Sequence, residues 1–184
     1  SVGARWGSIG PCDLTGTRVV ANKKIAVFSG HNWAYVPPKV EACNHLVEQL
    51  PPVSAWGLHY YIGMLKERSK YTYRVIASEN KTRVFENSRL AAVLNAGEYF
   101  ENLNVTQHLQ ITADKPILVA QFAQGFKNGD SVGDPMMILV SPTQQFMNEY
   151  RVATPISGDW HHYINLVAPT ESISKIRLNG KRID

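Results

Sequence analysis

Residues 46–77 read LVEQLPPVSAWGLHYYIGMLKERSKYTYRVIA, and this stretch has a counterpart later in the chain. Residues 138–168 read ILVSPTQQFMNEYRVATPISGDWHHYINLVA. An internal period of this kind indicates structural units of like design. The matching positions lie 90 residues apart and include Pro52 with Pro142, Trp56 with Phe146, Tyr60 with Tyr150, and Tyr73 with Tyr163.

Segments on both sides of these stretches match at a spacing of 92. Residues 82–88 (TRVFENS) align with residues 174–180 (SKIRLNG). Residues 21–28 (ANKKIAVF) align with residues 113–120 (ADKPILVA). We therefore predict about two pseudo-repeats of roughly 90 residues.

This pattern predicts a single all-β domain over residues 1–184. The repeat cores are expected near residues 45–122 and 137–184, and residues 17–30 are expected to complete the second core. The chain does not begin with Met, which favours a fragment of a longer protein. Identity between the two stretches is low, so shared β-strand composition is the alternative interpretation.

Short runs rich in Val, Ile, Tyr and Thr alternate with turn residues, which is typical of an antiparallel β-sandwich or a barrel-like fold. Residues 40–50 also fit helical spacing, but their counterpart is a β-rich run, so we predict a strand over residues 45–50. Asn179-Gly180 is a strong hairpin signal. The other predicted strands are residues 17–20, 25–28, 59–65, 71–78, 82–86, 90–94, 98–100, 108–112, 117–122, 137–140, 149–153, 163–167 and 175–178.

The composition restricts the classes of function. The chain has 184 residues, 44% hydrophobic and 18% charged, which suits a folded protein that buries a core without metal or disulfide support. The net charge is +4, but the basic residues are scattered and form no stripe with stacking aromatics, which argues against a nucleic-acid partner. No apolar run is long enough to span a bilayer, and the N-terminus has no signal-peptide pattern.

Cysteines and sequons together favour an oxidising, extracellular compartment. The chain has two cysteines, Cys12 and Cys43, and an even count is consistent with a disulfide between them. Two Asn-x-Thr sequons make Asn80 and Asn104 candidate N-glycosylation sites in expected surface turns. The alternative is that the cysteines are two unrelated buried thiols.

A string of motifs resembles one family. The motifs are VFSGH at 27–31, Cys43 with HLVEQLPPV at 45–53, WG at 56–57, YRVIA at 73–77, ADKPILVAQ at 113–121 and GDP at 133–135. In combination they resemble the N-terminal domain of the IgG Fc-binding protein family, over about residues 17–168. The resemblance implies a secreted, glycosylated, non-enzymatic module, often beside von Willebrand type D or mucin-like domains. It transfers no binding residues.

One pattern could indicate a hydrolase. Gly129-Asp130-Ser131-Val132 is similar to an esterase nucleophile motif, and Asp159 with His162 supplies an Asp-x-x-His. A serine nucleophile needs a base within hydrogen-bond reach. Esterases of that type resemble an α/β/α sandwich, whereas Ser131 lies in the middle of an all-β pattern. An ordinary polar loop is the favoured interpretation.

Three patterns could indicate a metal site. Cys43-Asn44-His45 lacks the second Cys/His pair that structural zinc requires. His161 and His162 are adjacent, so in a strand they would point to opposite faces and could not readily bind one ion. The loop over residues 128–134 has oxygen ligands at alternate positions but no bidentate Glu for calcium. We predict no metal and no cofactor.

The aromatic residues suggest a contact surface. Alternation along strands places about half of them in the core and half outside, so Tyr60 and Tyr61 must face opposite sides of one strand. Our candidate interaction residues are Trp56, Tyr61, Trp160 and His161.

We therefore expect a non-catalytic protein-interaction or adhesion module of a secreted, mucus-type glycoprotein. The expected partners are other extracellular proteins or glycans, or further domains or chains of the same assembly. The alternatives are a small-ligand or metal-binding carrier, a hydrolase on a β-scaffold, and a purely structural spacer.

Overall fold

A computed structural model of the chain describes residues 13–154, 158 and 161–183. The chain divides into two compact units, residues 1–150 and residues 151–184, which are described separately below. All strand pairs among the described residues are antiparallel, and the helical segments are short 3₁₀ turns. The predicted all-β, antiparallel fold class is therefore confirmed. The single domain over residues 1–184 stays a prediction.

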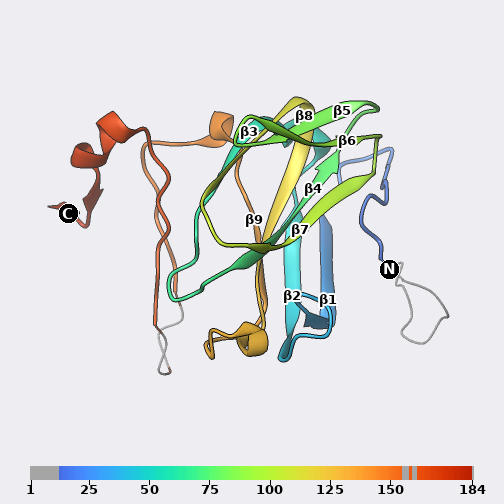
Figure 1. The fold of residues 1–184 in the computed structure, drawn as a ribbon. Helices are drawn as coiled ribbons and strands as arrows, with labels where there is room; N and C mark the ends of the chain where they lie inside the picture. Colours follow the sequence, from blue (N-terminus) through green and yellow to red (C-terminus); the bar gives the residue numbers. More distant parts are fainter. Residues whose placement is uncertain (1–12, 155–157, 159–160, 184) are drawn as a thin grey trace. The chain divides into compact units, whose positions relative to one another are not determined.

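The first unit contains one large sheet and a separate hairpin (Figure 1). The sheet has the order β6-β5-β8-β4-β7, and β3 and β9 also pair with β8. The hairpin is formed by β1 and β2. The strands are β1 (Val27–Tyr35), β2 (Cys43–Leu50), β3 (Gly57–Ile62), β4 (Tyr71–Ala77), β5 (Thr82–Glu86), β6 (Arg89–Leu94), β7 (Tyr99–Val105), β8 (Leu109–Ala123) and β9 (Met136–Leu139).

The long strand β8 organises the large sheet. Strands β3 and β5 pair with its first part, and β4 and β9 pair with its second part. The sequence predicted two strands separated at residues 113–116, and this was wrong. The register of β3 on β8 shifts between Gly57 and His59, so the extra residues of β8 are accommodated as a bulge. Pro116, which cannot donate a ladder hydrogen bond, lies in this irregular part.

The core lies on one face of β4 and β8. Alternate side chains along β4 are fully buried and pack with those of β8, as the period of two requires. The ring of Tyr73 meets that of Phe100 edge to face, with centroids 6.2 Å apart. Tyr60 is buried and Tyr61 is exposed, which confirms the prediction that they face opposite sides of β3.

Hairpin β1–β2 both confirms and corrects the sequence analysis. Residues 45–50 belong to a strand and not to a helix, because β2 pairs with β1 along its length. The predicted strand at residues 17–20 is not present. The sequence predicted a strand over residues 25–28 and none over residues 29–38, but β1 begins at Val27 and continues to Tyr35, with an irregularity between His31 and Ala34. Pairing with β2 overrides the turn-forming residues of that segment.

Two proline turns have the same local structure. Pro52 precedes η1 (Val53–Ala55) with φ −62° and ψ 154°, and Pro142 precedes η3 (Thr143–Gln145) with φ −69° and ψ 154°. In both, the residue after the helix donates its N–H to the carbonyl of the first helical residue, which closes the turn. The turns are 90 residues apart, as the aligned prolines predict.

Each proline turn is followed by a tyrosine that accepts a backbone hydrogen bond. The N–H of Gly57 donates to the hydroxyl of Tyr60 at 2.9 Å, and the N–H of Met147 donates to the hydroxyl of Tyr150 at 2.9 Å. The two turns also touch, since a Cβ on Gly57 would lie 2.4 Å from the Cβ of Pro142. Glycine at position 57 therefore allows the close packing of the two turns.

The second unit contains η4 (Thr170–Lys175) and a small hairpin of β10 (Arg177–Leu178) and β11 (Lys181–Arg182). The predicted strand at residues 163–167 is not formed, and neither is the one at residues 149–153, which begins in the first unit. The predicted turn at Asn179-Gly180 is present, and both residues have positive φ. Asn87 and Ser88, which align with them, have positive φ between β5 and β6.

The structure does not confirm a molecule built from two complete repeats. Tyr73 is fully buried in β4, whereas its aligned residue Tyr163 is half exposed and lies outside any strand. Local geometry recurs at the predicted spacing in the proline turns, in the Asn-containing turns, and in the hairpins β1–β2 and β8–β9. Four residue pairs of β1–β2 have counterparts that also pair in β8–β9, at a spacing of 92 for β1 and 90 for β2. The pairs in β1–β2 are Phe28–Gln49, Ser29–Glu48, Gly30–Val47 and His31–Leu46. Their counterparts, in the same order, are Ala120–Leu139, Gln121–Ile138, Phe122–Met137 and Ala123–Met136.

Candidate interaction surface

Hairpin β1–β2 has one covered face and one exposed face. Residues that pair across the strands share a face, so Phe28 and Gln49 lie on the same side as Gly30 and Val47. We call this side the outer face. The exposed fractions of Phe28 and Val47 are 64% and 56%. Large apolar side chains at this exposure are a recognised mark of contact surfaces when they gather.

Aromatic residues extend this surface along β1. Trp33 lies at the irregularity of the strand and is 61% exposed, and Tyr35 is also exposed. The indole Nε1 of Trp33 donates to the hydroxyl of Tyr35 at 3.3 Å. The backbone N–H of Trp33 donates to Nδ1 of His31 at 3.0 Å. These contacts hold the indole on the exposed side of the hairpin.

The opposite face of the hairpin is fixed to the large sheet. Leu46 is buried on this side, and β2 packs beside β9. The Nδ2 of Asn44 donates to the carbonyl of Pro135 at 3.1 Å. The N–H of Gly125 donates to the carbonyl of Val36 at 2.8 Å. The outer face is therefore presented on a supported scaffold, which lowers the entropic cost of binding.

The structure places the four predicted surface residues in different settings. Tyr61 is exposed on β3, and its hydroxyl accepts a hydrogen bond from Nε2 of Gln110 at 3.1 Å. Trp56 is only half exposed, because its Nε1 donates to the carbonyl of Pro51. His161 is exposed in the second unit, and Trp160 lies outside the described residues. A common surface of these four residues stays a prediction.

The sequence alone does not identify Phe28, Trp33 or Val47 as surface residues. Their pattern is the same apolar alternation that marks core strands elsewhere in the chain, so hydrophobicity alone could not distinguish them. The predicted positions of Phe28 and Val47 give no such signal either, because residues 17–30 were expected to complete the second repeat core and residue 47 lies within the first.

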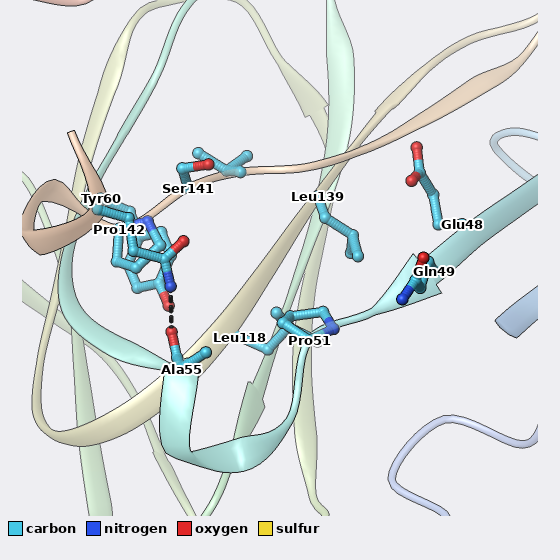
Figure 2. Close-up of a pocket in the computed structure, with 11 residues that line it drawn as sticks. Glu48, Gln49, Pro51, Ala55, Tyr60, Leu118, Leu139, Ser141 and Pro142 are labelled. Atoms are coloured by element: carbon cyan, nitrogen blue, oxygen red, sulfur yellow. Dashed lines mark hydrogen bonds between the residues drawn. The ribbon is translucent and has the colours of Figure 1, made fainter. Parts of the chain in front are cut away.

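A shallow cavity lies between the two proline turns (Figure 2). Figure 2 shows Glu48 and Gln49 at one end and Tyr60 with Pro142 at the other, with Leu139 between them. Its volume is about 200 Å³, which is below the usual 300–1,000 Å³ of small-molecule sites. Burial raises the pKa of Glu48, and it raises the pKa of Tyr60 to about 12. The cavity is therefore small and open to solvent, and it gives no support to a small-ligand carrier.

The loop over residues 125–135 is organised around Arg68. The guanidinium of Arg68 donates to the carbonyls of Gln124 at 3.0 Å, Val132 and Asp134. Two backbone carbonyls of the loop, those of Val132 and Asp134, thus accept hydrogen bonds from a side-chain cation. No group of three or more His, Cys, Asp or Glu residues that could hold a metal occurs in the part of the chain that the structure describes.

Asp130 has a structural role in the same loop. Its carboxylate accepts the N–H of Ser69 at 3.1 Å and Nδ2 of Asn128 at 3.0 Å. Burial acts to raise the pKa of Asp130, but these hydrogen bonds outweigh it and lower the pKa below the usual value. The N–H of the neighbouring Ser131 donates to the carbonyl of Phe126, and Asp159 lies outside the described residues. Nothing in the described loop activates Ser131 as a nucleophile.

The covalent sites predicted from the sequence remain predictions. Cys12 lies outside the described residues, and Cys43 is half buried on β2, where it pairs with Tyr35. Asn80 is exposed in the turn before β5, and its Oδ1 accepts the N–H of Ala96 at 3.1 Å. Asn104 is also exposed, but it lies on β7, so the prediction that it is in a turn was wrong. In both cases the side chain reaches solvent, as a glycan requires.

Within the described residues, no helix is both long enough and apolar enough to cross a bilayer. The family model described as IgGFc binding protein matches residues 8–184. The chain belongs to this family. It is 30% identical to the IgGFc-binding protein of Homo sapiens over 175 residues, which is 93% of this chain and 3% of that relative. The chain therefore spans a small part of the relative, and no solved structure matches it.

Proposed function

We propose that this chain is a non-catalytic, extracellular protein-binding module of a secreted glycoprotein, and that it binds through the outer face of hairpin β1–β2. The observation that carries the proposal is the exposed apolar row formed by Phe28, Trp33, Tyr35 and Val47 on a supported hairpin. Family membership supports a binding role, because the named relative is an IgGFc-binding protein.

The composition of the outer face fits a protein partner. It combines aromatic and aliphatic side chains with Gly30 and Gln49, and no Asp, Glu, Lys or Arg lies among the paired residues of this face. The centres of protein–protein interfaces are likewise depleted of charged residues and enriched in aromatic ones. Aromatic anchors of this kind supply most of the binding free energy at such surfaces.

The secreted location brings two further proposals. Cys12 and Cys43 form a disulfide, and Asn80 and Asn104 carry N-linked glycans. Both are expected of an extracellular protein. Peptide mapping of the secreted protein by mass spectrometry checks both, and a free thiol on Cys43 with unmodified sequons would contradict them.

The Fc region of IgG is the partner that the name of the relative suggests, and we choose it as the probe. The secreted chain is titrated onto immobilised Fc in a surface-based binding assay. We expect Phe28→Ser to weaken the affinity at least about tenfold, because it removes a central aromatic anchor. Leu90→Ser on β6 is the matched control, since Leu90 is also an exposed apolar residue but lies away from the hairpin.

The two parts of the proposal can fail separately. No binding to Fc would exclude Fc as the partner. Equal binding by the Phe28→Ser and Leu90→Ser variants would exclude the outer face as the contact surface. Deglycosylated Fc distinguishes the classes of partner, because loss of binding on removing its glycan would indicate a glycan and not a protein surface.

A further inference from the structure

Glu48 is a carboxylate on the covered side of hairpin β1–β2. Side chains alternate along β2, so Glu48 lies on the same side as Leu46 and Leu50, away from the outer face. The side chain of Glu48 is half-buried. A carboxylate in such a position costs free energy unless a cation or a hydrogen-bond donor replaces its lost hydration.

The part of the chain that the structure describes supplies no such partner for Glu48. Its carboxylate has no hydrogen bond and no ion pair among these residues. Loss of hydration raises the pKa of Glu48, and no neighbouring group acts against it. The carboxylates of Asp114 and Asp130, by contrast, accept hydrogen bonds that lower their pKa values. The fold therefore places Glu48 without using its charge.

Glu48 lines the cavity between the two proline turns (Figure 2). It is the one charged residue among the described residues that line this cavity. Figure 2 shows Leu139, Pro51 and Leu118 between Glu48 and the opposite end. An apolar passage that ends at a carboxylate is complementary to a side chain with a hydrocarbon stem and a cationic head. The volume of about 200 Å³ suits one long side chain.

The opposite end of the cavity is polar. The Nε2 of Gln145 donates to the carbonyl of Ala55 at 2.6 Å, the hydrogen bond that Figure 2 draws as a dashed line. The Oε1 of Gln145 and the hydroxyl of Ser141 remain as acceptors among the residues that line the cavity. They can bind main-chain N–H groups of a segment that inserts a side chain toward Glu48.

The cavity adjoins the outer face of the hairpin. Gln49 lies on the outer face, where it pairs with Phe28, and it also lines the cavity. A protein that is bound to the outer face can therefore reach the cavity with one side chain.

We propose that this cavity is a pocket for an arginine side chain of a partner protein, and that the guanidinium binds the Glu48 carboxylate. A guanidinium donates two parallel hydrogen bonds to a carboxylate, and it is more weakly hydrated than the ammonium of lysine. Arginine therefore enters a half-buried site at a lower cost than lysine. The inference deepens the proposed function and rests on it for the choice of a protein as the partner.

A peptide titration tests the pocket without Fc. The probe is an acetylated and amidated alanine–arginine–alanine tripeptide, and its control is the same peptide with citrulline, which is an uncharged isostere of arginine. NMR spectroscopy follows the backbone amide signals of Gln49 and Gln145, which line the cavity. We expect saturable shifts with the arginine peptide, and a dissociation constant at least about tenfold higher for the citrulline peptide.

Variants of the chain test the role of the carboxylate. Glu48→Gln should raise the dissociation constant of the arginine peptide at least about tenfold and should leave the unfolding temperature unchanged, because no contact of the fold is lost. Glu67→Gln is the matched control, since Glu67 is an exposed carboxylate that does not line the cavity. Phe28→Ser should keep the peptide affinity, so a failure of the outer face and a failure of the pocket are separate results.

Three outcomes would overturn the arginine pocket. The first is equal affinity for the arginine and citrulline peptides, and the second is equal affinity of the wild-type chain and Glu48→Gln. The third is a lower unfolding temperature in Glu48→Gln, which would give the carboxylate a structural role instead.

Discussion

Hairpins β8–β9 and β1–β2 have the same strand register but opposite environments. Ile117 on β8 is fully buried, whereas Ile25, its counterpart just before β1, is 56% exposed. Ala120 is buried on β8, and its counterpart Phe28 is the most exposed large side chain of β1. The strand with the larger apolar side chain at this position is thus the one left in solvent.

The difference comes from the neighbours of each strand. β8 has partners on both edges, and its alternate side chains are buried in the core. β1 has a partner on one edge and no cover over its outer face among the described residues. The same local design is therefore buried in one place and exposed to solvent in the other.

The largest expected effect comes from the matched isoleucines. Ile117→Ala should lower the free energy of unfolding by about 3–4 kcal/mol, because it removes buried apolar contacts and leaves a cavity. Ile25→Ala should change it by less than about 0.5 kcal/mol, since its side chain is already solvated. Urea unfolding followed by far-UV circular dichroism measures both. Similar losses for the two variants would show that Ile25 is covered in solution and would remove the contrast between the hairpins.

The matched tyrosines should show a smaller contrast. The Tyr60 hydroxyl donates to the carbonyl of Ile117 at 2.5 Å and accepts the N–H of Gly57, and all three residues are buried. Tyr60→Phe leaves two buried backbone groups without a partner, which should cost about 2–3 kcal/mol.

Tyr150→Phe is the control for Tyr60→Phe. Its hydroxyl accepts the equivalent hydrogen bond from Met147, but the side chain is exposed, so water can replace the hydroxyl. We expect a change below about 0.5 kcal/mol in the same urea experiment. A cost at Tyr150 as large as that at Tyr60 would mean that the second proline turn is buried in solution.

The fold class and much of the core could be predicted from the sequence. Alternation of apolar residues is a local signal, and it correctly separated Tyr60 from Tyr61. The repeat alignment also corrected a helical pattern over residues 40–50, because a strand counterpart outweighs an ambiguous period.

The length and the pairing of strands could not be read from local patterns. Residues 113–116 were expected to break β8, but partners on both sides carry the strand through them. Residues 163–167 have a good strand composition and yet form no strand, since propensity alone does not decide where a strand forms. The outer face was missed for the same reason, since Phe28 and Val47 look like core residues until their neighbours are known.

The smallest expected effect on the free energy of unfolding concerns the carboxylate of Asp114 on β8, which has no charged counterpart near β1. Asp114 accepts hydrogen bonds from the N–H and from Nε of Arg83, both at 2.8 Å, whereas its counterpart at the spacing of 92 is the uncharged Asn22. The Arg83 hydrogen bonds lower the pKa of Asp114 below its usual value of 3.8. The folded state therefore binds this proton less readily than the unfolded state. The resulting stability is present above the unfolded pKa and is lost as the pH falls through the folded pKa.

Asp114→Asn tests this charge by making the position match its counterpart. The pair is exposed to solvent, so the variant should lose only about 0.5 kcal/mol of unfolding free energy at pH 7. It should also lose less stability than the wild type when urea unfolding is repeated below about pH 4, because the group that gains a proton on unfolding is gone. Asn22→Asp adds a carboxylate at an exposed position and should keep the wild-type acid dependence, since the Arg83–Asp114 pair is intact. An unchanged acid limb in Asp114→Asn would show that Arg83 does not hold the carboxylate in solution, and the charge difference between the hairpins would then have no energetic consequence.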